Sequence, residues 1–138
     1  MRLRIVFFTG LLACLSLTCW AQDPNEPTDV DEQSRYLGLR HSLDTCIDQS
    51  QSVMPTLIAC VDTEFAYQDK RLNRIYARLM KSLSPDARTA LRDEERAWIK
   101  FKQTTCAVPD VPGQGQILDA ASCSMMETAR RARALEHR

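Results

Sequence analysis

Adjacent carboxylates in the stretch DEERAW are the side chains of this chain best suited by type to do chemistry: Asp93, Glu94 and Glu95 precede Trp98. Two carboxyl groups that face each other across a cleft, roughly 5 Å or 6.5–9.5 Å apart, can hydrolyse a glycosidic bond. Successive residues of a helix, however, point about 100° apart, so these three acids do not converge on one substrate. We expect them to be solvated or paired, with Glu95 on the inner face beside Trp98 and bound to a helix arginine.

Asp69, Asn73 and Tyr76 form a second constellation, because spacings of four and three residues put them on one flank of a helix. They are either a polar patch that contacts a partner or structural groups, with Tyr76 packed and its hydroxyl at the rim. We favour the structural interpretation and expect Arg131, on the last helix, to pair with Asp69. Trp98 and Arg131 belong to the same structural set.

Other reactive arrangements are missing from the sequence. No nucleophile elbow surrounds a serine, and there is no CxxC motif. The only histidines are His41 and His137, which makes a zinc site a poor interpretation. We therefore predict no catalytic residue, no metal and no cofactor, and we expect that the protein is not an enzyme.

The N-terminus has the layout of a secretory signal peptide over residues 1–21, with a basic start, an apolar run and cleavage after Ala21. The alternative is lipidation at Cys14 within LLAC, which would anchor the chain to a membrane in the envelope. The apolar run continues past Cys14, which favours a periplasmic or secreted protein without an anchor. Residues 22–34 are acidic and poor in apolar side chains, so we expect a flexible leader before a single domain over residues 35–138.

Export would leave four cysteines, an even number that indicates two disulfides in an oxidising compartment. Three connectivities are possible. We propose the pairing between sequence neighbours, which closes two short loops worth about 3 kcal/mol each. The pairs are Cys46 with Cys60 and Cys106 with Cys123.

Apolar residues recur at helical spacing and nowhere alternate with a period of two, so the sequence predicts an all-α fold. We expect a small disulfide-stapled domain of three main helices plus a short N-terminal helix. The short helix runs from about Tyr36 to Asp48, and the three others cover about Ser52–Leu83, Ser84–Cys106 and Leu118–His137. Residues 107–116 between the last two are predicted to form a loop by their Pro and Gly content.

Charge gives few clues to a partner. Removing Arg2 and Arg4 from the 18 Lys and Arg leaves 16, against 18 Asp and Glu, for a net charge of −2. This argues against a nucleic-acid partner. Two segments remain as candidate contacts with a protein partner: the C-terminal arginines, including Arg130 and Arg133, and the loop with Gln114 and Gln116. The arginines also suit a solvated helix end, and a loop closed by a disulfide would bind with a reduced entropy cost.

Taken in order, the motifs are C-x13-C, D-x2-LN-x2-Y-x2-L, RAW-x2-F-x4-C, a Gly-containing loop and C-x4-T-x2-R-x3-L. This set, which covers residues 46–135, resembles the family of small exported bacterial proteins typified by the lysozyme inhibitor LprI. The residues that carry it are Cys46, Cys60, Asp69, Leu72, Asn73, Tyr76, Leu79, Arg96, Ala97, Trp98, Phe101, Cys106, Gly113, Cys123, Thr128, Arg131 and Leu135. One departure is Lys102-Gln103, where the family usually has Arg-Asp.

The resemblance implies a helical fold and, for at least some members, inhibition of lysozyme in the cell envelope. The expected partner is therefore lysozyme or a related cell-wall hydrolase, blocked by steric occlusion. The alternative is an envelope adaptor, or an immunity protein that binds a different toxin or envelope partner.

Overall fold

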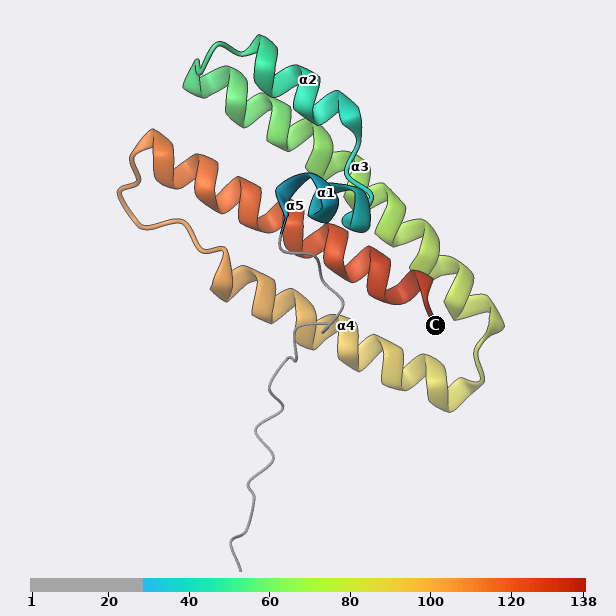
Figure 1. The fold of residues 1–138 in the computed structure, drawn as a ribbon. Helices are drawn as coiled ribbons and strands as arrows, with labels where there is room; N and C mark the ends of the chain where they lie inside the picture. The colour runs from blue at the N-terminus through green and yellow to red at the C-terminus, as the bar shows by residue number, and fades with distance from the viewer. Residues whose placement is uncertain (1–28) are drawn as a thin grey trace, which may run out of the picture.

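Residues 29–138 are described by the computed structural model, and they contain helices and no strand. Figure 1 shows five helices: α1 (Val30–Leu37), α2 (His41–Gln49), α3 (Met54–Ser82), α4 (Pro85–Thr105) and α5 (Gln114–Glu136). The all-α prediction is confirmed. The expected signal peptide, the cleavage after Ala21, the alternative lipidation of Cys14 and the start of the leader all lie outside the described residues. Within the described part, no helix is long and apolar enough to cross a membrane.

The boundaries of α3 and α4 follow local sequence signals. Pro55 lies in the first turn of α3, where a missing backbone N–H does no harm. Ser84 precedes α4 and its hydroxyl accepts a hydrogen bond from the N–H of Ala87, while Pro85 occupies the first turn. These side chains place the turn between the two helices where the sequence predicts it.

The N-terminal part differs from the prediction, because two short helices replace the single one. Gly38 separates α1 from α2 with a φ of +73°, a left-handed conformation that glycine adopts without strain. The predicted end of the leader at residue 34 is also wrong, since α1 begins at Val30. Asp29 accepts a hydrogen bond from the N–H of Glu32, and Leu37 is buried at the other end of the helix. Capping and burial together order this segment.

The last helix begins four residues earlier than predicted. The backbone N–H of Gly113 donates to Oε1 of Gln116 over 2.9 Å, a side-chain cap that starts α5 at Gln114. Gln114 and Gln116 therefore lie in the first turn of α5 and not in the loop. The loop itself is shorter than predicted and covers residues 107–113.

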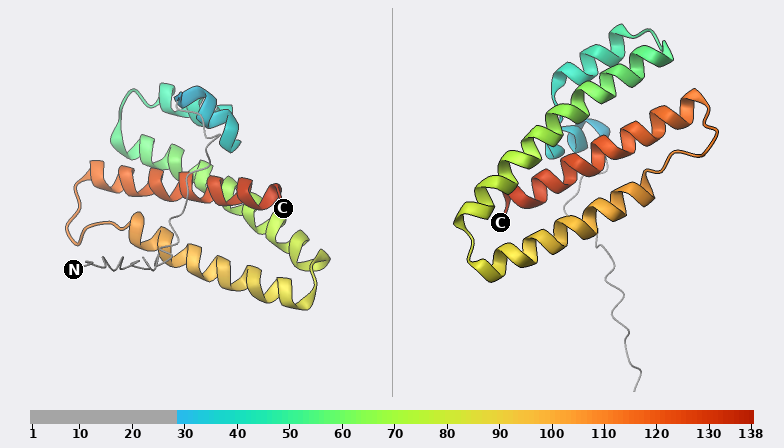
Figure 2. Two further views of the ribbon diagram at one scale, coloured as in Figure 1. Left: turned by 60° about the horizontal axis from the view of Figure 1, so that its bottom comes forward. Right: turned by 180° about the vertical axis from the view of Figure 1, so that it is seen from behind.

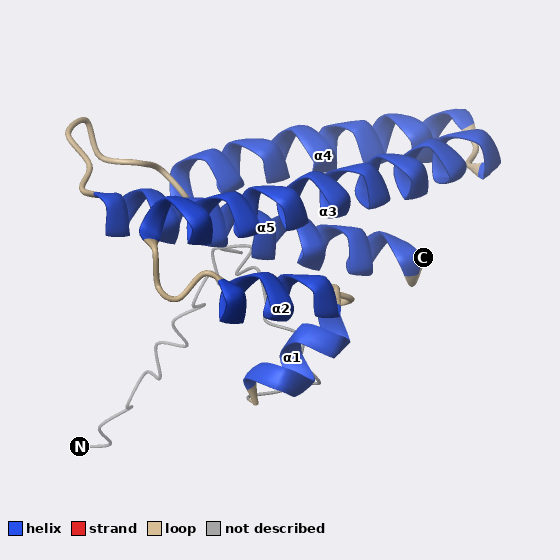
Figure 3. Cartoon of the chain, turned by 90° about the horizontal axis from the view of Figure 1, so that it is seen from above, coloured by secondary structure: helices blue, strands red, loops and turns tan. Residues whose placement is uncertain are grey.

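α5 is the central element of the bundle. It runs in the same direction as α3 and opposite to α4, and it packs against both (Figures 1 and 2). Its contact with α3 is the closer one, since Ala129 and Ala132 are fully buried and their small side chains let helices approach. α2 lies along the first half of α3, and α1 lies against α5 (Figures 1 and 3).

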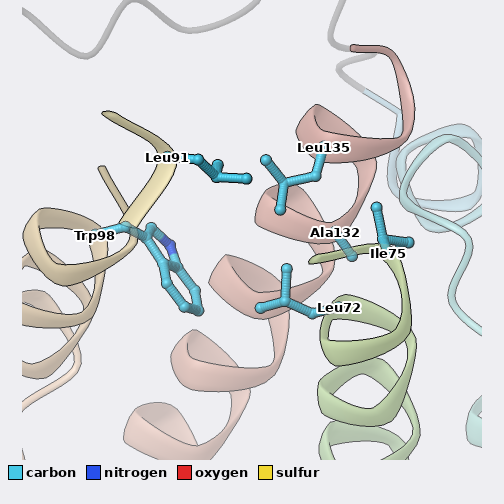
Figure 4. Packing of buried hydrophobic residues seen from close by; sticks show 6 residues of the cluster. All are labelled: Leu72, Ile75, Leu91, Trp98, Ala132 and Leu135. Carbon is cyan, nitrogen blue, oxygen red and sulfur yellow. The ribbon is translucent and has the colours of Figure 1, made fainter. Parts of the chain in front are cut away.

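Two apolar clusters form the core. At the turn end, which holds the α3–α4 turn, side chains from α3, α4 and α5 point toward one another (Figure 4). They are Leu72, Ile75, Leu91, Trp98, Ala132 and Leu135. The opposite half holds both disulfides, and we call it the disulfide end. Its buried cluster comprises Leu43, Cys60, Val61 and Met125.

Candidate functional site

Both disulfides join neighbouring helices. Cys46 pairs with Cys60 and links α2 to α3, while Cys106 pairs with Cys123 and links the end of α4 to α5. The pairing proposed from the sequence is confirmed. The second bond closes the loop of residues 107–113 between two fixed points, whereas the first closes the short turn of residues 50–53 between α2 and α3.

The closed loop exposes apolar side chains. Val111 is 91% exposed and Val108 is 49% exposed, and Ile117 follows them in the first turn of α5. Pro109 and Pro112 restrict the backbone of the same segment. A disulfide at one end and the Gly113–Gln116 cap at the other thus hold two exposed valines in place. The sequence analysis did not single out these valines, although apolar residues in a Pro-rich loop were the available signal.

The arginines near the C-terminus are engaged within the fold. Arg130 lies 2.8 Å from a carboxylate oxygen of Glu127, and the guanidinium of Arg133 stacks 3.7 Å from the ring centre of Tyr36. Arg133 therefore ties α5 to α1. These contacts fix the side chains on the surface of their own protein, which leaves them little freedom to reach into a partner.

Arg131 pairs with α4 and not with Asp69, so that part of the prediction is wrong. The guanidinium is 8% exposed and lies 2.5 Å from Oε1 of Glu95 and 3.4 Å from Oε2 of Glu94. Glu95 is thus the inward acid bound to a helix arginine that the sequence analysis expected. Asp69 lies on α3, and the ion pair forms across the interface between α4 and α5 instead, because Glu95 lies on the inner face of α4 and the partly exposed Glu94 lies at its edge.

Asp69, Asn73 and Tyr76 do not form a reactive group. The amide of Asn73 donates to Oδ2 of Asp69 over 3.0 Å along the exposed side of α3, and Tyr76 packs against the cluster at the turn end. Neither Asp69 nor Asn73 lines a cavity, and neither is activated by a base. The structure brings two of the three together and turns the third toward the core.

Trp98 is buried, and Lys102 lies one turn further along α4 beside it. The ammonium of Lys102 is 4.7 Å from the Trp98 ring and 5.2 Å from the Phe65 ring, and it donates to the hydroxyl of Thr128 over 3.3 Å. Burial lowers the pKa of Lys102, and the charge of Asp69 acts in the opposite direction. Lys102 is the first residue of the Lys102-Gln103 pair, which replaces the usual Arg-Asp of the family. It thus packs between two aromatic rings.

A buried polar network that the sequence analysis missed joins α3 to the turn after α1. Gln68 is fully buried and donates to the carbonyl of Gly38 over 2.8 Å and to Glu64 over 2.7 Å. Glu64 also accepts from the backbone and the guanidinium of Arg40. The available signal was the position of Glu64 and Gln68, one turn apart on the apolar face of a helix.

Arg71 extends this network to the end of α5. It donates to the carbonyl of Leu37 over 2.6 Å, to Gln68 over 2.9 Å and to a carboxylate oxygen of Glu136 over 2.9 Å. One side chain therefore holds the first and last helices on α3. These groups have their hydrogen-bonding capacity filled by the fold, so we assign them to structure.

Two surface carboxylates have lowered pKa values, whereas a general acid needs a raised pKa. Hydrogen bonding to Arg138 holds the pKa of Glu94 below its ordinary value, and Arg131 adds to this effect. Arg71 lowers the pKa of Glu136 in the same way. A glycosidase acid needs a raised pKa to keep its proton. Among the described residues, no group of three His, Cys, Asp or Glu could hold a metal ion.

The loop of residues 107–113, with Ile117 at its base, is thus the candidate site, and its exposed apolar side chains make it a candidate surface for contact with another protein. A comparison with family models matches residues 46–135 to the lysozyme inhibitor LprI. Searches of curated proteins and of solved structures returned no match. The two disulfides and this match both indicate an exported protein. Because the match covers most of the chain and spans the four paired cysteines, this protein is a member of the LprI lysozyme inhibitor family.

Proposed function

We propose that the protein is an exported inhibitor of lysozyme, or of a related cell-wall hydrolase, and that loop 107–113 occludes the substrate cleft of the enzyme. The family match supports lysozyme as the partner. The observation that carries the choice of surface is the pair of exposed valines held in a loop between the Cys106–Cys123 disulfide and the Gly113–Gln116 cap.

The energetics of binding favour such a loop. Burying one valine side chain from water contributes about 1.5–3 kcal/mol. A flexible loop would lose part of this gain when it becomes ordered, but this loop is already restricted by a disulfide and two prolines. Val108, Val111 and Ile117 supply the apolar area, and the exposed Asp110 lies between the two valines.

The C-terminal arginines are the weaker candidate. Arg130, Arg131 and Arg133 would have to leave Glu127, Glu95 and Tyr36 before they could bind a cleft, which would weaken the fold. The structure thus supports the loop over the arginines, a choice that the sequence leaves open. Gln114 and Gln116 remain candidate contacts at the base of the loop.

Occlusion needs no chemistry from the inhibitor. The carboxylates Glu94 and Glu136 are bound to arginines and have lowered pKa values, so they do not provide a proton donor. We expect a one-to-one complex that forms reversibly and turns nothing over. The inhibitor would act by excluding the cell-wall polysaccharide from the catalytic carboxylates of the hydrolase.

The test is a cell-wall lysis assay into which the oxidised protein is titrated, with animal and bacterial lysozymes measured side by side. Val111→Asp places a charge on the side chain proposed for burial, and we expect it to weaken inhibition about tenfold or more. Val30→Asp is the matched control, because Val30 is 75% exposed on α1, away from the loop. We expect the control to inhibit like the unmodified protein.

The outcome separates the two functional hypotheses. Dose-dependent inhibition that Val111→Asp weakens and Val30→Asp leaves intact supports the proposal. Equal inhibition by both variants would reject the loop as the contact. If no lysozyme of any class is inhibited, the function itself is wrong, and an adaptor or immunity protein becomes the better hypothesis.

A further inference from the structure

The second half of α3 carries a line of four cations on its outer face. Lys70, Arg74, Arg78 and Lys81 follow one another at spacings of four, four and three residues, and all four are exposed. On a helix this spacing forms one stripe about 16 Å long. We call these residues the α3 basic stripe. α2 covers only the first half of α3, so the stripe lies on the part of the helix that extends beyond it (Figure 1).

Only one of these cations has a visible role in the fold, since Lys81 lies in the last turn of α3, where a positive charge suits the helix dipole. The positions three and four residues before and after each of them hold no acidic side chain. Within residues 29–138, none of the four lies within ion-pair distance of a carboxylate, whereas Arg40, Arg71 and Arg131 each pair with a glutamate. Like charges four residues apart also weaken a helix slightly. A stripe that works against its own helix is best explained by a partner outside the chain.

The surroundings of the stripe determine the chemistry of that partner. The exposed large apolar residues of the described chain lie elsewhere, on α1, α2, the turn before α3, α4, loop 107–113 and the start of α5. Beside the cations, the outer face of α3 presents the small residues Ala66, one turn before Lys70, and Ala77. A protein interface has an apolar centre that is depleted in lysine. This surface has no such apolar centre, and it contains two lysines. A straight row of charges on a convex helix suits a flat anionic surface.

We propose that the α3 basic stripe holds the exported protein against the phosphate headgroups of an anionic lipid bilayer. This is an electrostatic, peripheral contact that needs no inserted helix and no lipid anchor. Each lysine or arginine near an anionic bilayer strengthens binding about fivefold, so four of them give a weak but measurable contact. The stripe lies toward the turn end and loop 107–113 lies at the disulfide end. The bilayer contact therefore leaves the loop free to bind another protein.

The experiment measures sedimentation of the oxidised full-length exported protein with vesicles at low salt. One set of vesicles contains equal parts of phosphatidylglycerol and phosphatidylcholine, and the other contains phosphatidylcholine alone. Arg74→Gln/Arg78→Gln removes the two central cations of the stripe. Arg92→Gln/Lys100→Gln is the matched control, because it removes two exposed cations from α4 and changes the net charge equally. Thermal unfolding establishes that both variants fold.

We expect binding to the anionic vesicles only, and binding that falls as salt rises. The α3 variant should bind about 25-fold more weakly, at about fivefold per cation, and the control should lose less than about threefold. Absence of binding to anionic vesicles would overturn the proposal, as would equal losses in the two variants. Binding to soluble polyphosphate without binding to vesicles would reject the bilayer as the partner. None of these readouts depends on lysozyme inhibition, so the bilayer contact and the inhibitory function are tested separately.

Discussion

The disulfide end and the turn end of the bundle hold their helices together by different means. At the disulfide end, Cys46–Cys60 and Cys106–Cys123 link neighbouring helices around a small apolar cluster. At the turn end, no disulfide lies among the described residues, and Trp98 on α4 packs into a larger cluster built from three helices. The ion pair of Arg131 with Glu95 adds to that packing.

This difference has a consequence for function. A covalent link keeps a segment in place without burying its side chains, so the disulfide end can expose Val108 and Val111 and still order the loop that carries them. Packing cannot do this, because it orders a side chain only by covering it. The turn end accordingly buries its large residues and presents cations on the outside of α3.

The largest effect on stability is expected at the turn end. Trp98→Ala removes the largest side chain of that cluster and should lower the free energy of unfolding by about 3–5 kcal/mol. Ile99→Ala is the control, because Ile99 follows Trp98 on α4 and is 43% exposed. It should lower the free energy by less than about 1 kcal/mol. Urea denaturation followed by circular dichroism measures both, and equal losses would contradict this account of the turn end.

The two disulfides offer the sharpest contrast between stability and function. Their cysteines are 14 and 17 residues apart, so removing either bond should lower the free energy of unfolding by a similar amount, about 3 kcal/mol. Cys106→Ser/Cys123→Ser should also weaken lysozyme inhibition, because it frees the loop, whereas Cys46→Ser/Cys60→Ser should inhibit normally. Denaturation and lysis assays on the same samples separate the effects. Equal inhibition by the two variants would show that the ordering of the loop is unimportant.

A smaller loss is expected from the polar network. Gln68→Ala leaves the carbonyl of Gly38 without its side-chain donor, removes one of the donors to Glu64 and removes an acceptor of Arg71. It should lower the free energy of unfolding by about 1–3 kcal/mol. Gln103→Ala, on the exposed side of α4, should change it by less than about 0.5 kcal/mol. Hydrogen exchange should show faster opening of α1 and α2 in the first variant. Unchanged exchange there would mean that the network does not hold these helices.

The smallest effect concerns pH. Glu94 and Glu136 have pKa values below the ordinary 4.5, so the unfolded chain binds protons at a higher pH than the folded one. Their contribution to stability is therefore complete above pH 4.5 and is lost as the pH falls through the lowered pKa values. Glu94→Gln/Glu136→Gln should flatten the fall of the melting temperature with acid. If the melting temperature of the variant fell with acid as steeply as that of the unmodified protein, Glu94 and Glu136 would not be the source of the acid sensitivity.

Local signals made much of the fold predictable from the sequence. Ser84 and Pro85 mark a helix start through contacts within four residues, and the apolar stripe of α3 continues through seven turns, so these elements could be recognised without a structure. The break at Gly38 was missed because apolar residues at helical spacing continue from Tyr36 past it. What ends α1 there is local: Gly38 adopts a φ of +73°, and the N–H groups of Gly38 and Leu39 donate back to the carbonyls of Arg35 and Ser34. The glycine itself was the available signal, and the hydrogen bond from Gln68 then fixes this turn on α3.

The candidate site could be predicted only in part. Cysteine number left three connectivities open, and the short loop lengths together with the family resemblance led to the proposed pairing. The choice between the loop and the arginines depends on tertiary contacts. Arg131 pairs with Glu95 on α4, and Arg133 stacks on Tyr36 of α1. No pattern within α5 reveals those partners. The exposure of Val111 likewise depends on how α4 and α5 leave the loop uncovered.

The most direct test of the central claim is a competition measurement. Calorimetry would give the affinity of the oxidised protein for lysozyme with and without a non-hydrolysed cell-wall oligosaccharide that fills the cleft. If loop 107–113 enters the cleft, the apparent affinity should fall in proportion to the occupancy of the cleft by the sugar. An affinity that stays the same when the cleft is full would contradict occlusion and place the contact elsewhere on the enzyme.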